Sequence, residues 1–542
     1  MINANKISSS RIWVLSLLLT LPIVVLYLSH FFSAVKKNDR IPTGFITVEM
    51  PYYVANALEY KEASDFHLCY ALPFSADYHN KPIYFHPQIF VMGMFLKYTS
   101  IHPLFLFLLF GFIFAVLSIR ISLLLLLQYQ LIPTKILNVI SILFIWGGGV
   151  LFVSGFGISI IKGMNFSGAL KNCFFLDPFD GWWFLNLGRN FIFPTEAYYH
   201  FLFLATVYLV CTKKIFQAVL VTILLALSHP FTGIAMLLIL ICWMLIEKIF
   251  YNNESFKWND FFVLIGGLSW FVYYNFFYLP SDGEHRILMQ QWTLDWSAGF
   301  KNYFPAYLLV LIPASFRLRS LEKLKLFFSI PFNRFLIIWL IINLGLENHD
   351  LFIKPHQPLH FTRGYVWACL FLIGLPEIIA TLKIIYEKKS VFIKSTLIIG
   401  LVSISLADNA SWISLQSLKL MNGGGIVLNS NQKEVLTYLN NHFSKNELLI
   451  SQDKTIGYLS TVYTPYRSLF THAFNTPNAA NKWNMVSRYL NYCDEDSSLM
   501  VVNQVLVVFK NRINCDWKKE SQLIFSNHEY EIWRRKGQDF SY

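Results

Sequence analysis

Residues 11 to 60 read RIWVLSLLLTLPIVVLYLSHFFSAVKKNDRIPTGFITVEMPYYVANALEY, and they set out the plan of the chain. The first part, Ile12 to Phe32, is an apolar run of about twenty residues, which is long enough to cross a bilayer. Lys6 and Arg11 precede it as in a signal peptide, but the run is long for one and no small-residue cleavage site follows. We therefore predict an uncleaved membrane anchor.

A lone acid, Glu49, follows the anchor at what we expect to be a membrane surface. Pro51 and apolar residues at helical spacing come next, so we predict a helix that lies along that surface. Glu49 is the first candidate for chemistry, and the aromatic pair Tyr52 and Tyr53 stands beside it. An acid at a helix start is also favoured by the positive end of the helix dipole, so a purely structural role stays open.

The composition predicts a multi-pass membrane protein. Of 542 residues, 55% are hydrophobic, 17% aromatic and only 14% charged, which does not fit a soluble globule. The formal net charge is +12, but Lys and Arg stand mainly in short loops between apolar runs. That distribution is the positive-inside pattern of membrane proteins, and we expect no nucleic-acid partner.

The apolar runs predict about eleven membrane-spanning helices. They cover residues 12–32, 104–127, 135–153, 197–212, 215–229, 231–249, 259–279, 304–316, 335–347, 361–384 and 391–410. With a cytoplasmic N-terminus, the Lys- and Arg-rich loops fall inside, and the loop 33–100 and the tail fall on the outer side. We expect a bacterial plasma membrane, with the tail on its periplasmic or extracellular face.

The fold class that we predict is an α-helical polytopic membrane protein with a C-terminal soluble α/β domain. Residues 1–410 form the membrane domain with its outer loop 33–100, residues 411–425 a linker that ends in GGG, and residues 426–542 the outer domain. Within these parts we predict an interfacial or re-entrant helix between His86 and Tyr98, a helix over 431–443, strands over 446–452 and 502–510, and a hairpin over 523–535. Cys493 and Cys515 could pair or stay as buried thiols, and the sequence leaves both open.

A second outer loop concentrates acids, an arginine and aromatic residues. It reads NCFFLDPFDGWWFLNLGRNFIFPTEAYYH, residues 172 to 200, and holds Asp177, Asp180, Trp182, Trp183, Arg189, Glu196 and His200. Glu196 and His200 share one helix face where the chain enters the membrane, a costly place for idle polar groups. The stretch 352 to 365, FIKPHQPLHFTRGY, adds His360 and Arg363 near the same face, although an arginine there could simply reach out of the membrane to water.

This layout resembles the GT-C superfamily of polytopic glycosyltransferases that use polyprenyl-phosphate sugars, such as oligosaccharyltransferases. The resemblance covers the first span, the large outer loop with an acid at its head, the phrase KPIYFHPQI, the second acidic loop and the soluble C-terminal domain. It implies that Glu49 is the catalytic carboxylate. It also implies that Asp177 or Asp180 would hold a divalent ion, Mg or Mn, if the protein uses one; no second acid stands beside Glu49.

Transfer of a sugar from a lipid phosphate needs a base near the acceptor and a cation that faces the departing phosphate. Glu49 could be that base, and Arg189 or Arg363 the cation. The aromatic candidates for contact with the sugar or the lipid are Tyr52, Tyr53, Trp182 and Trp183. The expected partners are the polyprenyl-phosphate-linked donor and membrane lipids, and the acceptor is a lipid, a glycan or a protein.

Two other classes of function stay open. One is a transporter or flippase for envelope lipids or glycans, although no internal repeat is evident and the charges stand at the outer ends of the spans. The other is a non-enzymatic membrane assembly protein. For an enzyme, we expect Asp177, Asp180 and Arg189 to approach Glu49 in space. The sugar, the acceptor and the oligomeric state are not set by the sequence.

Overall fold

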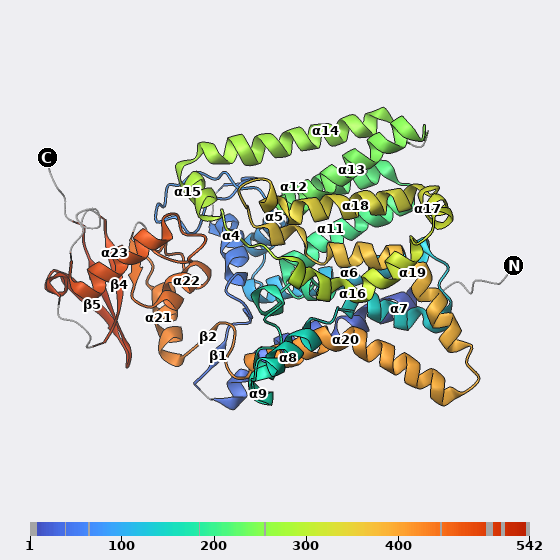
Figure 1. Cartoon of the computed structure of the whole chain (residues 1–542). Coiled ribbons are helices and arrows are strands. Elements are labelled where there is room, and N and C mark those ends of the chain that lie inside the picture. The colour runs from blue at the N-terminus through green and yellow to red at the C-terminus, as the bar shows by residue number, and fades with distance from the viewer. Residues whose placement is uncertain are drawn as a thin grey trace. The chain divides into compact units, whose positions relative to one another are not determined.

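The fold of the chain is mainly helical, as the computed structural model shows (Figure 1). The structure describes residues 8–37, 39–62, 65–183, 185–253, 256–444, 447–494, 502–510 and 515–537. The chain divides into two compact units. Unit 1 comprises residues 1–26, 108–273 and 294–418, and unit 2 comprises residues 27–107, 274–293 and 419–542. We describe each unit by itself.

Unit 1 is built from helices. They are α1 (Ser9–Leu19), the start of α2 (Leu21–Phe31), α6 (Pro103–Tyr129), α7 (Thr134–Trp146), α8 (Leu151–Ile161), α9 (Phe166–Lys171), α10 (Leu187–Asn190), α11 (Pro194–Cys211), α12 (Ile215–Ser228), α13 (Pro230–Phe250), α14 (Trp258–Tyr273), α16 (Phe300–Arg317), α17 (Leu321–Phe328), α18 (Pro331–Glu347), α19 (Tyr365–Tyr386) and α20 (Val391–Met421). Several of these helices are apolar on all sides, as helices in contact with lipid are.

The protein is an integral membrane protein. In the described part of the chain, six helices are long and apolar enough to cross a membrane, or up to eight if each of two bent helix pairs counts as one span. Each of the eleven expected spans falls on a helix, but a count of eleven is not confirmed. One reason is α18, which is 17 residues long and carries Arg334, Asn343 and Glu347 among its apolar residues.

Unit 2 combines short helices with strands. They are α3 (Ser33–Lys36), α4 (Met50–Glu62), α5 (Pro87–Tyr98), α15 (Gly283–Gln291), α21 (Ser430–Asn441), α22 (Lys454–Tyr463), α23 (Ala479–Tyr492), β1 (Ile41–Pro42), β2 (Val427–Leu428), β3 (Leu448–Ser451), β4 (Gln504–Phe509), β5 (Ser521–Ser526) and β6 (Tyr530–Arg535). The expected helix after Glu49 and the expected helix after His86 are confirmed as α4 and α5.

The C-terminal part of unit 2 forms a four-stranded sheet in the order β3-β4-β6-β5. Strand β3 is parallel to β4, and the other two pairs are antiparallel. Apolar residues of β3, β4 and α23 form one core, with Ile450, Leu506 and Tyr489 fully buried. The helix, the two strands and the closing hairpin expected from the sequence are confirmed as α21, β3, β4 and β5-β6.

The first loop and the C-terminal part pack together inside unit 2. Strand β1 pairs with β2, so that Ile41 stands opposite Leu428. The hydroxyl of Tyr458 in α22 donates to the carbonyl of Val48 at 2.6 Å. Helix α20 continues to Met421, through most of the segment expected as a linker. The domain boundaries stay a prediction, but the loop and the tail belong to one body.

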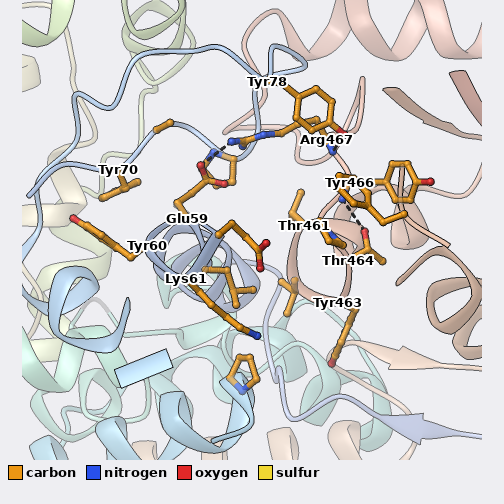
Figure 2. Close-up of a pocket in the computed structure, with 18 of the residues that line it drawn as sticks. Glu59, Tyr60, Lys61, Tyr70, Tyr78, Thr461, Tyr463, Thr464, Tyr466 and Arg467 are labelled. Atoms are coloured by element: carbon orange, nitrogen blue, oxygen red, sulfur yellow. Dashed lines mark hydrogen bonds and ion pairs between the residues drawn. The ribbon is translucent and has the colours of Figure 1, made fainter. Parts of the chain in front are cut away.

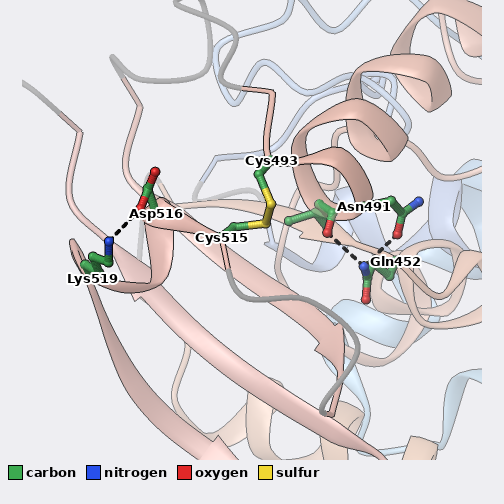
Figure 3. Close-up of a disulfide and its surroundings, with 7 residues drawn as sticks. Gln452, Asn491, Cys493, Cys515, Asp516 and Lys519 are labelled. Atoms are coloured by element: carbon green, nitrogen blue, oxygen red, sulfur yellow. Dashed lines mark hydrogen bonds and ion pairs between the residues drawn. A yellow bond between two sulfur atoms is a disulfide. The ribbon is translucent and has the colours of Figure 1, made fainter.

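A disulfide joins Cys493, at the end of α23, to Cys515 (Figure 3). The two Cα atoms are 5.1 Å apart and the cysteines are 22 residues apart in sequence. Of the two alternatives that the sequence left open, the structure has the pair. Disulfides persist in oxidising compartments, which agrees with an outer location for this part of the chain.

Candidate active site

Glu49 lies in the turn that leads into α4, and it is partly buried. Burial raises the pKa of the Glu49 carboxyl above its ordinary value, because the charged form loses hydration there. A carboxyl with a raised pKa is closer to the pH at which it can both accept and release a proton. The local environment of Glu49 therefore suits acid-base chemistry.

The neighbouring tyrosines of Glu49 are held by ring contacts inside unit 2. Tyr52 stacks on Phe74 with 5.2 Å between ring centroids, and Tyr53 stacks on Phe107 at 6.4 Å. Both tyrosines stay partly exposed. Their rings are thus fixed in orientation at the start of α4.

In unit 1, Arg189 is the centre of a buried polar cluster. Its Nη1 donates to the Asp177 carboxylate at 2.6 Å and to the carbonyl of Gly181 at 2.7 Å. Its Nε donates to the side-chain oxygen of Asn409 at 2.6 Å, and its Nη2 donates to the carbonyl of Asp408 at 3.2 Å. All three guanidinium nitrogens thus have protein partners, so the cluster joins the loop of residues 172–200 to α20. Sequence reasoning missed Asp408 and Asn409.

Asp177 is the buried acid of this cluster, with 3% of its surface exposed. One carboxylate oxygen binds Arg189, and the other has no hydrogen-bond partner among the residues that the structure describes. Burial raises the pKa of the Asp177 carboxyl to about 6, and the Arg189 guanidinium acts in the opposite direction. Burial therefore disfavours the charged form of Asp177, and the ion pair with Arg189 favours it.

Asp180, three residues later, is exposed and is held by its backbone. Phe179, Asp180 and Gly181 have φ values of 53°, 56° and 80°, so three successive residues are in the left-handed region. Two of them are not glycine, and such conformations carry strain that the surroundings must hold in place. Here the Trp412 indole donates to the Asp180 carbonyl at 2.8 Å. The turn therefore sets the direction in which the Asp180 side chain extends from the backbone.

A second buried cluster joins the start of α11 to the loop before α19. Arg363 forms an ion pair with the Glu196 carboxylate, and it contacts the ring nitrogen Nδ1 and, at 3.1 Å, the carbonyl of His360. Both ring nitrogens of His200 lie 2.8 Å from carbonyl oxygens, those of Glu196 and Arg363. The structure thus brings together Glu196, His200, His360 and Arg363, which the sequence singles out.

The backbone at Arg363 is also in the left-handed region. Arg363 has a φ of 33° and Gly364 a φ of 71°. A Cβ on Gly364 would lie 2.6 Å from the Cα of Leu187, next to the Arg189 cluster. A glycine is therefore required where the loop before α19 crosses α10.

Trp296 lies between the two clusters. Its ring is 4.9 Å from the ring of Phe179 and stacks on His360 at 5.6 Å with an interplanar angle of 13°. The indole thus connects the turn that carries Asp180 to the loop that carries Arg363. No periodic pattern or charge marks Trp296 in the sequence, because its role depends on a contact between distant loops.

The tryptophan pair of the second loop packs on the Arg189 cluster. Trp182 meets Trp412 edge to face at 5.0 Å, and Trp183 meets Phe193 at 4.5 Å. Both are partly buried. Trp182 thus reaches the cluster through Trp412, whose ring lies 5.0 Å from the Arg189 guanidinium.

The structure brings together nine of the twelve candidate residues in unit 1. They are Asp177, Asp180, Trp182, Trp183, Arg189, Glu196, His200, His360 and Arg363. Glu49, Tyr52 and Tyr53 belong to unit 2. The expected approach of Asp177, Asp180 and Arg189 to Glu49 stays a prediction.

The acids of unit 1 do not fit a divalent metal ion. Asp177 is bound to Arg189, and no group of three or more His, Cys, Asp or Glu side chains in the described ranges is arranged to hold a metal. Mg²⁺ and Mn²⁺ prefer several oxygen ligands at one point. We therefore derive no step through a metal.

Comparison with known proteins gives similarity in structure alone. No family model matches the chain, and no curated protein matches it. Among solved structures, the oligosaccharyltransferase of Archaeoglobus fulgidus in the apo form is 12% identical with a TM-score of 0.47, over 90% of this chain and 70% of that chain. ArnT from Cupriavidus metallidurans bound to undecaprenyl phosphate is 10% identical with a TM-score of 0.44, over 97% of this chain and 98% of that chain. The chain is thus similar to a solved oligosaccharyltransferase, one of the kinds of enzyme to which its sequence layout shows a resemblance.

Proposed function

We propose that the protein is a membrane glycosyltransferase that moves a sugar from a polyprenyl-phosphate donor to an acceptor on the outer side of the membrane. In this proposal the N-terminus is cytoplasmic, and the loop that carries Glu49 and the C-terminal sheet domain face outward. The proposal rests on the chemistry of the candidate residues and on the layout of the chain.

One observation carries the proposal: the exposed carboxylate of Asp180 leaves a strained, backbone-pinned turn beside two buried arginine clusters. Strained turns that hold a polar side chain outward are typical of functional sites. Trp296 connects this turn to the Arg363 cluster, so acid, arginine and aromatic ring lie within one region of unit 1.

In the proposed reaction, Glu49 accepts the proton of an acceptor hydroxyl or amide while the oxygen or nitrogen of that group attacks the anomeric carbon of the sugar. The new bond to the anomeric carbon forms while the bond from that carbon to the phosphate oxygen breaks. The polyprenyl phosphate leaves with the electron pair, and the positive charge of Arg363 faces it. Asp177 and Asp180 balance the positive charge of the site.

The aromatic residues would position the sugar and the lipid. Trp182 and Trp183 are partly exposed in the loop that carries the Arg189 cluster, and Tyr52 and Tyr53 are partly exposed near Glu49 in sequence. Flat rings bind the C–H faces of sugars and isoprenoid chains without competing for their polar groups. The donor's polyprenyl chain explains why such an enzyme works in a bilayer.

The experiment measures sugar transfer from a radiolabelled polyprenyl-phosphate sugar in proteoliposomes. Asp180→Asn should reduce the rate about tenfold or more, because it removes an exposed charge from the site. The matched control is Asp516→Asn, an exposed aspartate of the sheet domain that pairs with Lys519. If neither variant changes the rate, Asp180 has no role in transfer.

The substrates can be found without a prior choice of donor. Mass spectrometry of envelope glycans and glycolipids from cells with and without the protein would show a missing sugar, which names both the reaction and the acceptor class. An unchanged glycan profile, together with no transfer in proteoliposomes, would contradict the proposed activity.

A further inference from the structure

A cavity of about 760 Å³ lies inside unit 2 (Figure 2). One wall comes from α4 and the segment after it, residues 58–62 and 67–82, together with residues 102–103. The other wall comes from residues 440–443 and 461–467 of the C-terminal part. The volume is in the range of small-molecule binding sites, about 300 to 1,000 Å³. No residue of the candidate active site lines it.

The cavity walls are held in place by Arg467. Its guanidinium donates to the Glu59 carboxylate at 2.7 Å and to the carbonyl of Leu72 at 2.9 Å. Its backbone N–H donates to the Tyr78 hydroxyl at 2.9 Å (Figure 2). That hydroxyl donates to the carbonyl of Glu447 at 2.8 Å. These bonds join the two walls, so the cavity is formed before any ligand enters it.

The lining of the cavity carries no net formal charge. Its charged side chains are two acids and two bases, namely Glu59, Glu62, Lys61 and Arg467. Glu59 and Arg467 form an ion pair and are mostly buried. Because Arg467 is already paired with Glu59, a phosphate finds no unpaired buried cation in the cavity, and the remaining base, Lys61, is exposed to water. The cavity therefore favours a neutral polar ligand.

Several tyrosine rings face the cavity with their hydroxyl groups already bound elsewhere. The Tyr60 hydroxyl donates to the carbonyl of Leu68 at 2.7 Å, and the Tyr70 hydroxyl lies 2.8 Å from the His86 ring nitrogen. The rings cannot turn without losing these bonds. Tyr60 and Tyr70 are buried against each other and against neighbouring rings, so they shape the wall. The lining rings that stay partly exposed, Tyr78 and Phe443, offer apolar faces on which the C–H groups of a sugar ring can pack.

Other polar groups of the lining remain available to a ligand. The Tyr463 hydroxyl at the end of α22 and the Asn440 amide on α21 have no hydrogen-bond partner in the part of the chain that the structure describes. A pyranose ring presents C–H faces and hydroxyl groups and carries no charge. The aromatic faces of the lining can contact the C–H groups, and the Tyr463 hydroxyl and Asn440 amide can bind the sugar hydroxyls.

We infer that this cavity binds a short neutral saccharide chain. The inference stands on the cavity in unit 2 and does not depend on the transfer reaction, because none of the proposed catalytic residues lines it. A saccharide held here would be bound by the outer loop and the C-terminal part together, through the walls that Arg467 joins.

The test measures saccharide binding by the full-length protein in detergent, with no lipid donor present. The probes are three neutral oligosaccharides, maltotriose, chitotriose and mannotriose, followed by saturation-transfer-difference NMR at millimolar concentration. We expect at least one probe to bind, with little dependence on salt because the lining is neutral. Tyr463→Ala should weaken that binding about tenfold through loss of a ring and a hydroxyl, and Asn440→Ala about fivefold.

The matched control is Tyr492→Ala, a tyrosine of the same unit that is 76% exposed and does not line the cavity. It should bind like the wild type. Asn440 is exposed, so its variant keeps the test valid if Tyr463→Ala fails to fold. The inference is overturned if no probe binds, if both cavity variants bind like the control, or if a neutral peptide or an acidic sugar binds more tightly than every neutral probe. Transfer activity is measured separately, so either idea can fail alone.

Discussion

Asp177 and Asp180 stand three residues apart, yet the protein gives the two carboxyl groups opposite surroundings. Asp177 is buried against Arg189, whereas Asp180 is exposed at a left-handed turn. A buried, paired acid holds structure together, and an exposed acid can meet a substrate. At the scale of single residues, we therefore expect Asp177 to act on stability and Asp180 and Glu49 on activity.

Glu49→Gln tests the proposed base. The amide keeps the shape of the side chain and removes its charge, so transfer should fall about 10² to 10⁴ fold, as general-base catalysis typically contributes. A helix-start charge is worth only about 0.3 to 1 kcal/mol, which would leave the rate within a few fold. Glu322→Gln, an exposed acid in the first turn of α17, is the control. Transfer in proteoliposomes is measured with expression level and donor binding, and a rate at half the wild type or above removes Glu49 from the catalytic residues.

The raised pKa of Asp177 predicts that the free energy of unfolding falls as the pH rises from about 4 to about 6. In the folded protein burial raises the pKa of Asp177 to about 6, whereas in an unfolded chain it is about 3.9. Between these values the folded state binds more protons, so the stability that the protonated carboxyl contributes is present below the window and lost across it. Thermal unfolding in detergent, compared between wild type and Asp177→Asn, should show a difference that changes across this window. A difference that is constant with pH would contradict the assignment.

The break between α7 and α8 shows how elements position the site. Glycines 147 to 149 separate the two helices, and a Cβ on Gly149 would lie 2.0 Å from the Pro305 carbonyl of α16. The Asp408 carboxylate of α20 accepts the backbone N–H groups of Leu151 and Phe152 at 3.1 and 2.8 Å. Asp408 thus caps α8, while its carbonyl accepts from Arg189. One turn of α20 therefore holds both α8 and the loop of residues 172–200.

Removal of that cap should destabilise the protein. Asp408→Ala leaves the first N–H groups of α8 without an acceptor, which costs about 1 to 2 kcal/mol for a helix cap. Ser414→Ala on the same helix is the control, because the Ser414 hydroxyl is exposed and bonds only within α20. The unfolding midpoint in detergent should fall for Asp408→Ala and stay constant for the control. Equal midpoints would show that α8 does not depend on Asp408.

The positions of the helices could be predicted from the sequence, because a run of apolar residues marks a helix whatever its neighbours are. The strands of the C-terminal domain followed from local patterns for the same reason. The partner of a buried charge could not be predicted. Arg189 meets Asp177, which is close in sequence, but also Asp408 and Asn409, about 220 residues away. The one sequence signal for the Arg189 cluster was the pair Asp408 and Asn409 within the last apolar run, because polar groups inside a span are costly unless they have partners.

At the scale of the whole molecule, unit 2 places the first loop and the C-terminal part in one body, so both must lie on the same side of the membrane. We predict that this is the outer side. Lys81→Cys and Lys433→Cys are exposed positions in the two segments, and Lys388→Cys lies in an expected inner loop. The five cysteines outside the disulfide are first replaced.

An impermeant maleimide added to intact cells should label Lys81→Cys and Lys433→Cys, and should label Lys388→Cys only after permeabilisation. Labelling of just one of the two outer positions would show that unit 2 does not form in the membrane. Labelling of Lys388→Cys in intact cells would reverse the proposed orientation.

The pairing of β1 with β2 has a consequence for biosynthesis. Ile41 pairs with Leu428, so about 390 residues of chain lie between the two strands. Ribosomes add ~5–20 residues per second, so the first loop leaves the ribosome about 20 to 80 s before its partner strand exists. During that interval β1 has no partner strand, and the cavity lacks the wall formed by the C-terminal part. The first loop therefore has no partner strand until the last fifth of the chain is being translated.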